Sequence, residues 1–351
     1  PLDRFSTFIY SLHPLYAGAR CNWDGEKAVV EHGTHAFMET SPFLSSPMAQ
    51  IVRNGVATIR RKLCDPECPD DFPAVAEFRA EGFTDYVAAE LIFGDGSRQC
   101  VSFSTRVPGG FTDHDLAQFE SVRQVLALVL DSHNNRALSS TLLNTYLGNI
   151  SGGRVLDGQI RRGDGDIIDA IVWFSDLRES TVLTKRLGRE AFLQVLNEYF
   201  DATAGAVIGN GGEVLRFIGD ASLAVFPVTP GEVGFTAAVT AAMNAAKEAM
   251  HQMDVLNADR HRREVPVLGY GIALNAGEVL FGNIGTATRL EFSVIGAAAN
   301  EAARMETLCK TEQCRLVVSE RIARATKLKW RHLGSRALRG VEGGDEYFGL
   351  S

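Results

Sequence analysis

The sequence contains no apolar run that approaches the ~18 residues needed to span a bilayer as a helix. Its most apolar segments, such as residues 170–174, have the length of strands in a protein core. No basic and then apolar stretch of the kind that forms a secretory signal opens the chain. We therefore expect a cytoplasmic protein without a membrane span.

Basic residues are not in excess either. The 351 residues include 35 Lys and Arg against 43 Asp and Glu, which gives a net charge of −8. A general nucleic-acid-binding protein is usually basic, so we expect no nucleic-acid partner. A nucleotide substrate stays open, because a few local cations and metal ions suffice to neutralise a triphosphate.

Cysteine is scarce and scattered. The chain has six, at Cys21, Cys64, Cys68, Cys100, Cys309 and Cys314. Cys64 and Cys68 have a spacing that a zinc site could use, but no second Cys or His pair follows nearby. We therefore expect reduced thiols in a cytosolic protein.

The length suggests two domains of ordinary size, and the pattern separates three regions. We expect a sensor domain over residues 1–133, a helical and glycine-rich connector over 134–168, and a catalytic domain over 169–351. In the first region, residues 85–105 have the pattern of two strands joined at Gly94-Asp95-Gly96. Thr112 or Asp113 could then cap a long helix.

The connector carries Leu138, Leu142 and Leu143 at helical spacing, and then six glycines between 148 and 165. Glycine at this density, with three arginines close by, predicts a polar segment that can change shape. From residue 168 onward, strand and helix patterns alternate. This order predicts an α+β fold with the helices packed on one face of the sheet.

Two carboxylates stand at the expected ends of strands. Asp176 follows the buried strand 171–174, and Asp220 lies at the tip of a hairpin between strands 213–217 and 222–226. If these strands are neighbours, their ends bring both carboxylates together. Such a pair suits Mg²⁺, which keeps waters and takes further ligands from phosphates. A cap and a simple turn are the structural alternatives for these two aspartates.

A polar pair follows in the C-terminal part of the chain. Asn300 and Arg304 are four residues apart and therefore share one face of a helix. An amide and a guanidinium presented together can bind a sugar oxygen and a phosphate oxygen. The alternative is a surface pair on an amphipathic helix.

Together these motifs resemble class III adenylate and guanylate cyclases. The segments that match, in the same order as in that family, are residues 173–178 (WFSDLR), 212–220 (GEVLRFIGD), 271–278 (GIALNAGE), 282–285 (GNIG) and 293–304 (SVIGAAANEAAR). Each segment alone is weak evidence, but their joint order and spacing are specific.

The resemblance implies a ferredoxin-like βαββαβ core that works as a head-to-tail homodimer, with active sites between the chains. It implies that Asp176 and Asp220 hold two Mg²⁺ or Mn²⁺ ions and that Asn300 and Arg304 come from the partner chain to orient the ribose and stabilise the α-phosphoryl group. The amides of the segment after Asp176 would face the phosphates, namely those of Leu177, Arg178, Glu179, Ser180 and Thr181.

Base choice falls on Arg216 and Ser293 under this resemblance. The family places an adenine-reading Lys at the position of Arg216, and Ser293 occupies the second base-reading position. Arg216 can donate to adenine N1 and Ser293 can accept from the 6-amino group, so we expect ATP as substrate and cyclic AMP as product. Arg339 stands where the family has a triphosphate-binding Lys. Arginine keeps the charge at both positions but changes the geometry.

Alternatives remain at this point. A guanylate cyclase is one, and a catalytically weak cyclase-like dimer that senses or scaffolds is another. Residues 343–347 (GGDEY) also look like the signature of diguanylate cyclases. Too few residues follow them to complete such a domain, so we expect a turn before the final strand there.

The first region resembles, more loosely, the GAF family of small-molecule sensors, with a PAS-like domain as the alternative. Trp23, His32 and His35 could line its pocket, although lone histidines are more often core or surface residues. An unknown small molecule or protein would be the signal, and the connector would carry it to the catalytic domain.

Overall fold

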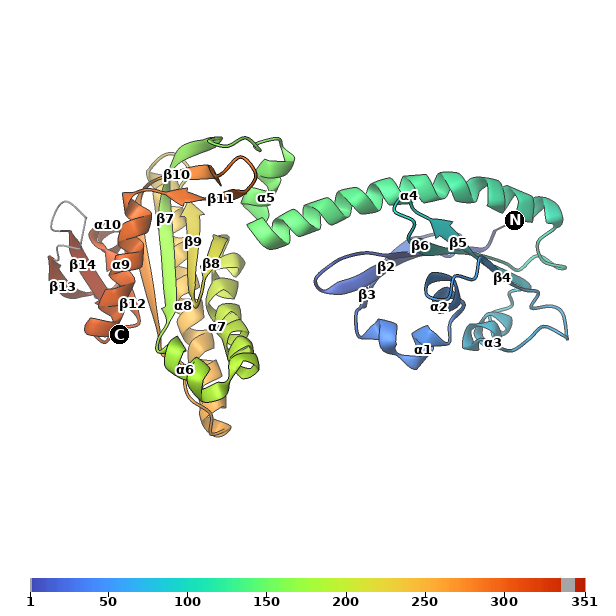
Figure 1. The fold of residues 1–351 in the computed structure, drawn as a ribbon, viewed down its shortest axis with the longest axis horizontal. Coiled ribbons are helices and arrows are strands. Elements are labelled where there is room, and N and C mark those ends of the chain that lie inside the picture. The colour runs from blue at the N-terminus through green and yellow to red at the C-terminus, as the bar shows by residue number, and fades with distance from the viewer. Residues whose placement is uncertain (1, 336–344, 351) are drawn as a thin grey trace. The chain divides into compact units, whose positions relative to one another are not determined.

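The computed structural model of the protein describes residues 2–335 and 345–350. The chain forms two compact units, Pro1–Leu142 and Leu143–Ser351, and each is described by itself (Figure 1). None of the helices in the described part of the chain combines the length and the apolarity that crossing a membrane requires.

The first unit is built on a six-stranded sheet of strand order β3-β2-β1-β6-β5-β4. Its elements are β1 (Arg4–Tyr10), β2 (Tyr16–Trp23), β3 (Ala28–Thr34), the 3-10 turn η1 (Phe37–Glu39), α1 (Ser41–Leu44), α2 (Pro47–Val52), β4 (Thr58–Arg61), α3 (Pro73–Ala80), β5 (Asp85–Ile92), β6 (Arg98–Thr105) and α4 (Asp113–Leu147). The short helices α1, α2 and α3 pack on one face of the sheet, and α4 packs on the other.

The predicted hairpin and helix start are confirmed. β5 and β6 pair as an antiparallel hairpin, and Gly96 adopts the positive φ of 82° that its turn requires. At the start of α4, the Thr112 hydroxyl accepts from the amide of Asp115, and the Asp115 carboxylate accepts from the amide of Thr112. This reciprocal capping fixes where the helix begins.

The helix ends where the connector was expected to break. α4 stops at Leu147, and Gly148 turns the chain with a φ of 91° into α5 (Asn149–Leu156). Two of the connector glycines, Gly152 and Gly153, lie inside α5 rather than in an irregular segment. A buried acceptor compensates: both carboxylate oxygens of Glu213 accept the first free amides of α5.

The second unit is built on an eight-stranded sheet of path β13-β14-β12-β10-β7-β9-β8, with β11 paired to β10. Its further elements are β7 (Gly165–Leu177), α6 (Ser180–Leu187), α7 (Arg189–Gly209), β8 (Glu213–Ile218), β9 (Ala221–Pro227), α8 (Glu232–Arg262), β10 (Tyr270–Gly285), β11 (Leu290–Ile295), α9 (Ala297–Thr311), β12 (Leu316–Ser319), α10 (Glu320–Ala325), β13 (Arg331–Ser335) and β14 (Glu346–Leu350). The four strands β10-β7-β9-β8 pair antiparallel throughout, which is the βαββαβ arrangement.

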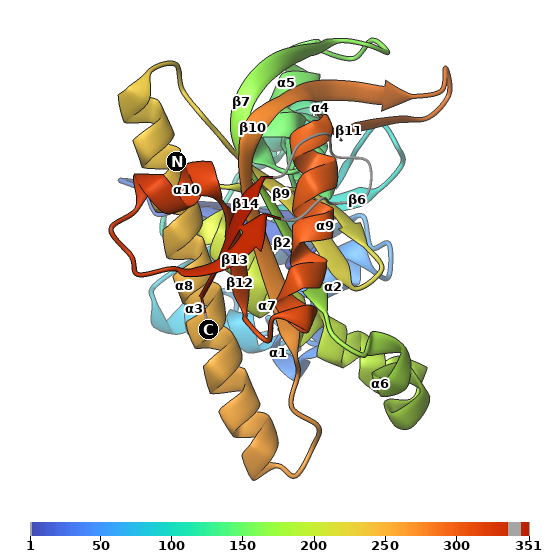
Figure 2. The same ribbon diagram turned by 90° about the vertical axis from the view of Figure 1, so that its left-hand side faces the viewer.

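The expectation that helices cover only one face of this sheet is wrong. α7 and α8 pack on one face, whereas α9 and α5 pack on the other, so that α8 and α9 lie on opposite sides of the strands (Figure 2). The reason lies in β7, where Ile171 and Trp173 contact the first layer while Ala170 and Val172 contact the second. A strand that is apolar at consecutive positions is buried on both faces.

β7 is longer than the predicted strand 171–174, and its added residues pair with β10. β7 begins at Gly165 and β10 extends to Gly285, and Gly165 lies opposite Gly282 in the ladder. A Cβ at Gly282 would lie 2.4 Å from the Cα of Gly165, so this close approach of the two strands requires glycine. Gly165, which was expected in the connector, therefore belongs to the sheet.

Candidate active site

Asp176 and Asp220 meet at one end of the central strands. Asp176 is the penultimate residue of β7 and pairs with Ala221 of β9, which directly follows Asp220 in the tight β8–β9 turn. The amide of Leu177 donates to the carbonyl of Asp220 at 3.3 Å and locks the turn onto the end of β7. Gly219 adopts a φ of 65°, which lets this turn close in two residues.

Asp220 perturbs the carboxylate of Asp176. Burial, and then the charge of Asp220 and a hydrogen bond to it, raise the pKa of Asp176 to about 6. A cation placed between them would relieve this repulsion. Within the described residues no set of three or more His, Cys, Asp or Glu side chains could hold a metal ion. Two carboxylates fit Mg²⁺ or Mn²⁺ completed by water and phosphate oxygens, and they do not fit a closed protein cage.

A third carboxylate stands behind this pair, and the sequence motifs did not point to it. Glu306 of α9 is buried, and its burial together with the charge of Asp176 raises the pKa of Glu306 to about 7. The side chain lies over Gly271, the residue of β10 that pairs with Asp176. A Cβ at Gly271 would lie 2.1 Å from a carboxylate oxygen of Glu306, so glycine there makes room for this side chain.

The segment after Asp176 is arranged differently from the expectation that all five of its amides face the phosphates. The amide of Leu177 is used by Asp220, and the amide of Arg178 donates to the carbonyl of Gly269 at 2.9 Å. Leu177 is buried in the core, and the Arg178 guanidinium donates to the carbonyl of Cys314 at 2.9 Å. Of the five expected residues, this leaves residues 179–181, at the start of α6, as the candidates for phosphate contact.

Arg216 and Ser293 are brought together within one chain. Arg216 of β8 donates from Nη2 to the Ser293 hydroxyl of β11 at 3.4 Å. Its Nε also forms an ion pair with Glu291 at 2.5 Å. Ser293 is buried, whereas Arg216 and Glu291 are partly exposed. Glu291 is a further residue that the motifs missed. Its position two residues before Ser293 puts it on the same side of β11, which is the signal that could have found it.

Asn300 and Arg304 lie on α9, on a different side from the residues with which this helix packs on the sheet. Asn300 is exposed, and Arg304 is half-buried, whereas Ala302 and Met305 are fully buried. Nη1 of Arg304 is buried and has no hydrogen-bond partner among the residues that the structure describes. A buried guanidinium nitrogen of this kind can donate to an anion.

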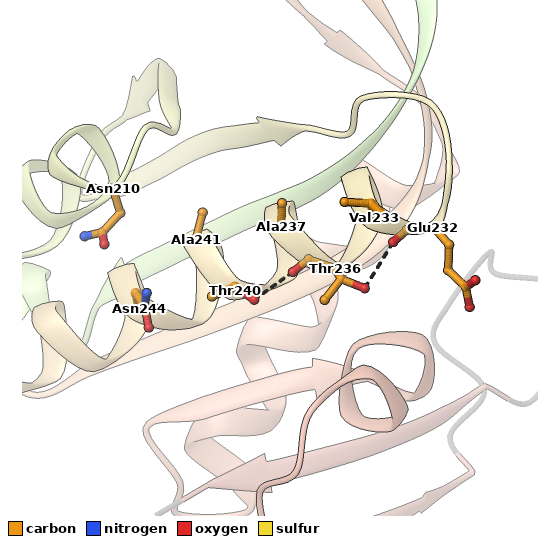
Figure 3. A pocket seen from close by; sticks show the side chains of 8 residues that line it. All are labelled: Asn210, Glu232, Val233, Thr236, Ala237, Thr240, Ala241 and Asn244. Carbon is orange, nitrogen blue, oxygen red and sulfur yellow. Dashed lines mark hydrogen bonds between the residues drawn. The ribbon is translucent and has the colours of Figure 1, made fainter.

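The structure does not describe all of the predicted residues, and it contains a hollow that the sequence did not predict. Arg339 and the glycines at 343 and 344 lie outside the described residues. One hollow in the second unit lies along α8, and its lining residues include neither Asp176 nor Asp220 (Figure 3). The Thr236 and Thr240 hydroxyls there donate to carbonyls one turn earlier, and the lining residues include no basic side chain. This hollow therefore lacks the groups that a triphosphate needs.

The first unit has a small hollow of its own. His32 lines it together with His13 and Tyr16, and the Tyr16 ring stacks between the two histidines at 4.8 and 4.9 Å. His35 contacts the carbonyl of His13 through Nε2 and is not among the lining residues, and neither is Trp23. Of the three residues expected to line a pocket, the structure thus places His32 at one.

Comparisons with known proteins fit this geometry. Residues 166–349 match the adenylate and guanylate cyclase catalytic domain family. An adenylate cyclase of Dictyostelium discoideum, specific to terminal differentiation, is 31% identical over 158 residues, which are 45% of this chain and 7% of that protein. An adenylate cyclase of Anabaena cylindrica is 29% identical over 157 residues, 44% of this chain and 30% of that protein.

Among solved structures, a bacterial light-regulated adenylyl cyclase shares the fold with a TM-score of 0.50 at 24% identity, over 66% of this chain and 64% of that one. The chain spans less than a third of the length of the two curated relatives.

Proposed function

The chain belongs to the adenylate and guanylate cyclase catalytic domain family, and we propose that it converts ATP to 3′,5′-cyclic AMP and pyrophosphate. The observation that carries the proposal is the meeting of Asp176 and Asp220 at the end of the central strands, where burial and then the charge of Asp220 raise the pKa of Asp176. A pair of this kind calls for a cation. A cyclase domain of this family implies a lyase that makes a cyclic nucleotide.

The proposed reaction is an in-line displacement at the α-phosphorus. The ribose 3′-oxygen forms a bond to the α-phosphorus, the bond from that phosphorus to the bridging oxygen of the β-phosphate breaks, and pyrophosphate leaves. The 3′-hydroxyl proton passes to solvent. Asn300 would orient the ribose. Nη1 of Arg304, which has no hydrogen-bond partner in the described part of the chain, would stabilise charge on the α-phosphoryl oxygens.

Asp176 and Asp220 would hold the divalent ions of the site, which we propose to be two Mg²⁺ or Mn²⁺ ions. Ions bound there supply positive charge that lowers the pKa of the 3′-hydroxyl and neutralises the triphosphate. The start of α6 would present the amides of residues 179–181 to the phosphates, where the helix dipole also favours negative charge. Arg339 is proposed as a further triphosphate ligand.

The choice of ATP rests on the Arg216–Ser293 pair. The Arg216 guanidinium and the Ser293 hydroxyl are within hydrogen-bonding distance of each other, so both can reach one base edge. Arg216 offers donors for adenine N1, and Ser293 offers an acceptor for the 6-amino group. Glu291 would hold the guanidinium in position through its ion pair. A guanylate cyclase is the second candidate.

The proposed site is shared between two chains. Asn300 and Arg304 lie on the side of α9 that does not pack on its own sheet, which favours contact with a second copy of the catalytic domain. Two copies related by a two-fold axis would then form two equivalent sites.

We also propose that the first unit is a GAF-like sensor that regulates the second. The mechanical link within the catalytic unit is α5, whose first amides are held by Glu213 at the start of the strand that carries Arg216. A weak cyclase-like dimer without turnover is the competing proposal. Comparing the full chain with one that begins at Leu143 tests regulation, and identical kcat, KM and metal response would contradict it.

The activity is tested by incubating the purified full chain with ATP or GTP and Mg²⁺ or Mn²⁺, and by identifying the nucleotide product by chromatography and mass spectrometry. We expect cyclic AMP, with kcat/KM for ATP well above that for GTP. Cyclic GMP as the main product would favour the guanylate cyclase, and no cyclic product with either nucleotide would favour the inactive dimer.

A further inference from the structure

The C-terminus of α9 brings two cysteines together. Two residues past the end of α9, Gln313 adopts a φ of 51°, and the amide of Cys314 donates to the carbonyl of Cys309 at 3.1 Å. A hydrogen bond across five residues next to a left-handed residue is the signature of the Schellman motif. In this motif the side chains of the residue that accepts the bond and of the residue that donates it lie in contact. Here these residues are Cys309 and Cys314.

The two thiols share one small core cluster. Cys309 is fully buried and Cys314 nearly so, and both pack with Val317, Leu333 and Tyr347. Both are free thiols in one cluster, and the Cys309 Sγ donates to the carbonyl of Ile272 at 3.4 Å. A disulfide needs Cα atoms about 4.4–6.8 Å apart, a range that the closed helix end favours.

The charges around the pair distinguish the two sulfurs. The hydrogen bond with Cys309, and then the guanidinium groups of Arg331 and Arg178, lower the pKa of Cys314 to about 7. The same hydrogen bond, together with burial, raises the pKa of Cys309. The thiolate therefore forms more readily at Cys314 than at Cys309, which is the arrangement of an attacking and a resolving thiol.

We propose that Cys309 and Cys314 form a reversible disulfide that adjusts the metal-binding end of the active site, with hydrogen peroxide as the oxidant. The Cys314 thiolate attacks a peroxide oxygen, the O–O bond breaks, and hydroxide leaves and is protonated by solvent. Cys309 sulfur then attacks the Cys314 sulfenic acid, the S–O bond breaks, and the departing hydroxide takes the Cys309 proton as water. Two thiols supply the two electrons that reduce peroxide to two waters.

The pair is connected to the carboxylates by short contacts. The carbonyl of Cys314 accepts from Arg178, which follows Asp176 by two residues. Cys309 lies against Gly271, because a Cβ added to Gly271 would lie 2.9 Å from the Cβ of Cys309. Gly271 in turn pairs with Asp176 in the sheet. Opening of the last helical turn gives peroxide access, since helix ends fray more easily than helix centres. Pulling the two sulfurs into a bond therefore shifts groups that hold Asp176 in place.

The test exploits the spacing of basic residues. Trypsin cleaves after Arg304, Lys310 and Arg315, so Cys309 and Cys314 fall on the separate peptides 305–310 and 311–315. The full chain is treated with peroxide, its remaining thiols are alkylated, and the digest is analysed by mass spectrometry. We expect the two peptides to be joined and to separate after dithiothreitol. Cys100 is the matched control, because it is also buried and its thiol also donates to a carbonyl, that of Val101, but it lies in a different core cluster from Cys309 and Cys314.

Recovery of both peptides unlinked and alkylated, under conditions that oxidise the exposed Cys64, overturns the proposal. Equal oxidation of Cys100 overturns it as well, because reactivity would then not depend on the pair. These readouts do not depend on the cyclase activity, so they stand if the proposed function fails.

The link to the site rests on the proposed function. Oxidised wild type should lose about tenfold or more in kcat, since a shift of about 1 Å can cost roughly a hundredfold, and dithiothreitol should restore it. Cys100→Ala should keep this response, and Cys314→Ala should lack it. If Cys314→Ala does not fold, Cys309→Ala replaces it. Unchanged kcat in disulfide-bonded wild type contradicts the link to the site.

Discussion

Replacing Glu213 by Gln should destabilise the catalytic unit and loosen the start of α5. The Glu213 side chain is 3% exposed, and its two carboxylate oxygens accept from the amides of Ile150 at 2.8 Å and Ser151 at 2.7 Å. Gln keeps the shape, but its amide nitrogen would face a backbone donor. The variant therefore leaves one buried amide without an acceptor and removes the negative charge at a helix N-terminus.

The size of the effect follows from these two losses. A hydrogen bond to a charged acceptor contributes about 1.5–3 kcal/mol, so Glu213→Gln should lower the free energy of unfolding by about 2–3 kcal/mol. For a unit of this size, a change of 1 kcal/mol shifts Tm by about 2–4 °C, so we expect a fall of about 4–12 °C. Gly148→Ala should act in the same direction, because its Cβ would lie 2.6 Å from the Glu213 carboxylate.

Tryptophan fluorescence can follow the catalytic unit alone. Of the three tryptophans, Trp173 and Trp330 lie in this unit, so thermal unfolding in a Trp23→Phe background reports on it. Glu248→Gln is the control, since Glu248 accepts from Asn210 at an exposed site and should change Tm by little. A Tm for Glu213→Gln as close to wild type as that of the control would refute the capping argument.

Three further predictions concern the site itself. Asp220→Ala should abolish turnover, because the phosphates lose their metal clamp, while the circular dichroism spectrum should stay that of wild type. Full activity of that variant, or of wild type in excess EDTA, would contradict the metal assignment. Arg216→Glu combined with Ser293→Cys should lower kcat/KM for ATP relative to GTP by removing donors to the adenine edge, whereas an unchanged ratio would mean that these residues do not choose the base. In EDTA, the folded chain binds a proton at Asp176 more tightly than the unfolded chain does, since the pKa of Asp176 is raised to about 6 from an ordinary value of about 3.9. The free energy of unfolding should therefore fall as the pH rises from about 4 to about 6, and Asp176→Asn should show a smaller fall in denaturant titrations; an equal fall would mean that other groups cause it.

Local patterns were sufficient for much of this fold. The hairpin at Gly94-Asp95-Gly96, the start of α4 and the β8–β9 turn that carries Asp220 all depend on residues next to one another in sequence, and all were predicted. The meeting of Asp176 with Asp220 was also predicted from the sequence, because the β8–β9 hairpin and the adjacent strand β7 are enough to place both residues.

Long-range contacts account for what the sequence did not predict. Glu306 is more than eighty residues from Asp220, and nothing in its own surroundings shows that α9 carries it over Gly271. The cap of α5 by Glu213 spans more than sixty residues in the same way. Packing of helices on both faces was missed because an apolar strand as short as 171–174 looks alike whether one or both faces are covered.

Trans complementation tests the central claim most directly, namely that Asp176 and Asp220 of one chain act with Asn300 and Arg304 of another on ATP. Asp176→Ala and Arg304→Ala should each form almost no cyclic AMP alone. Mixed in equal amounts under exchange conditions, they should recover about a quarter of the wild-type rate, because half of the dimers are mixed and each has one intact site. No recovery in a mixture shown to contain heterodimers, or full activity of either variant alone, would contradict the shared site.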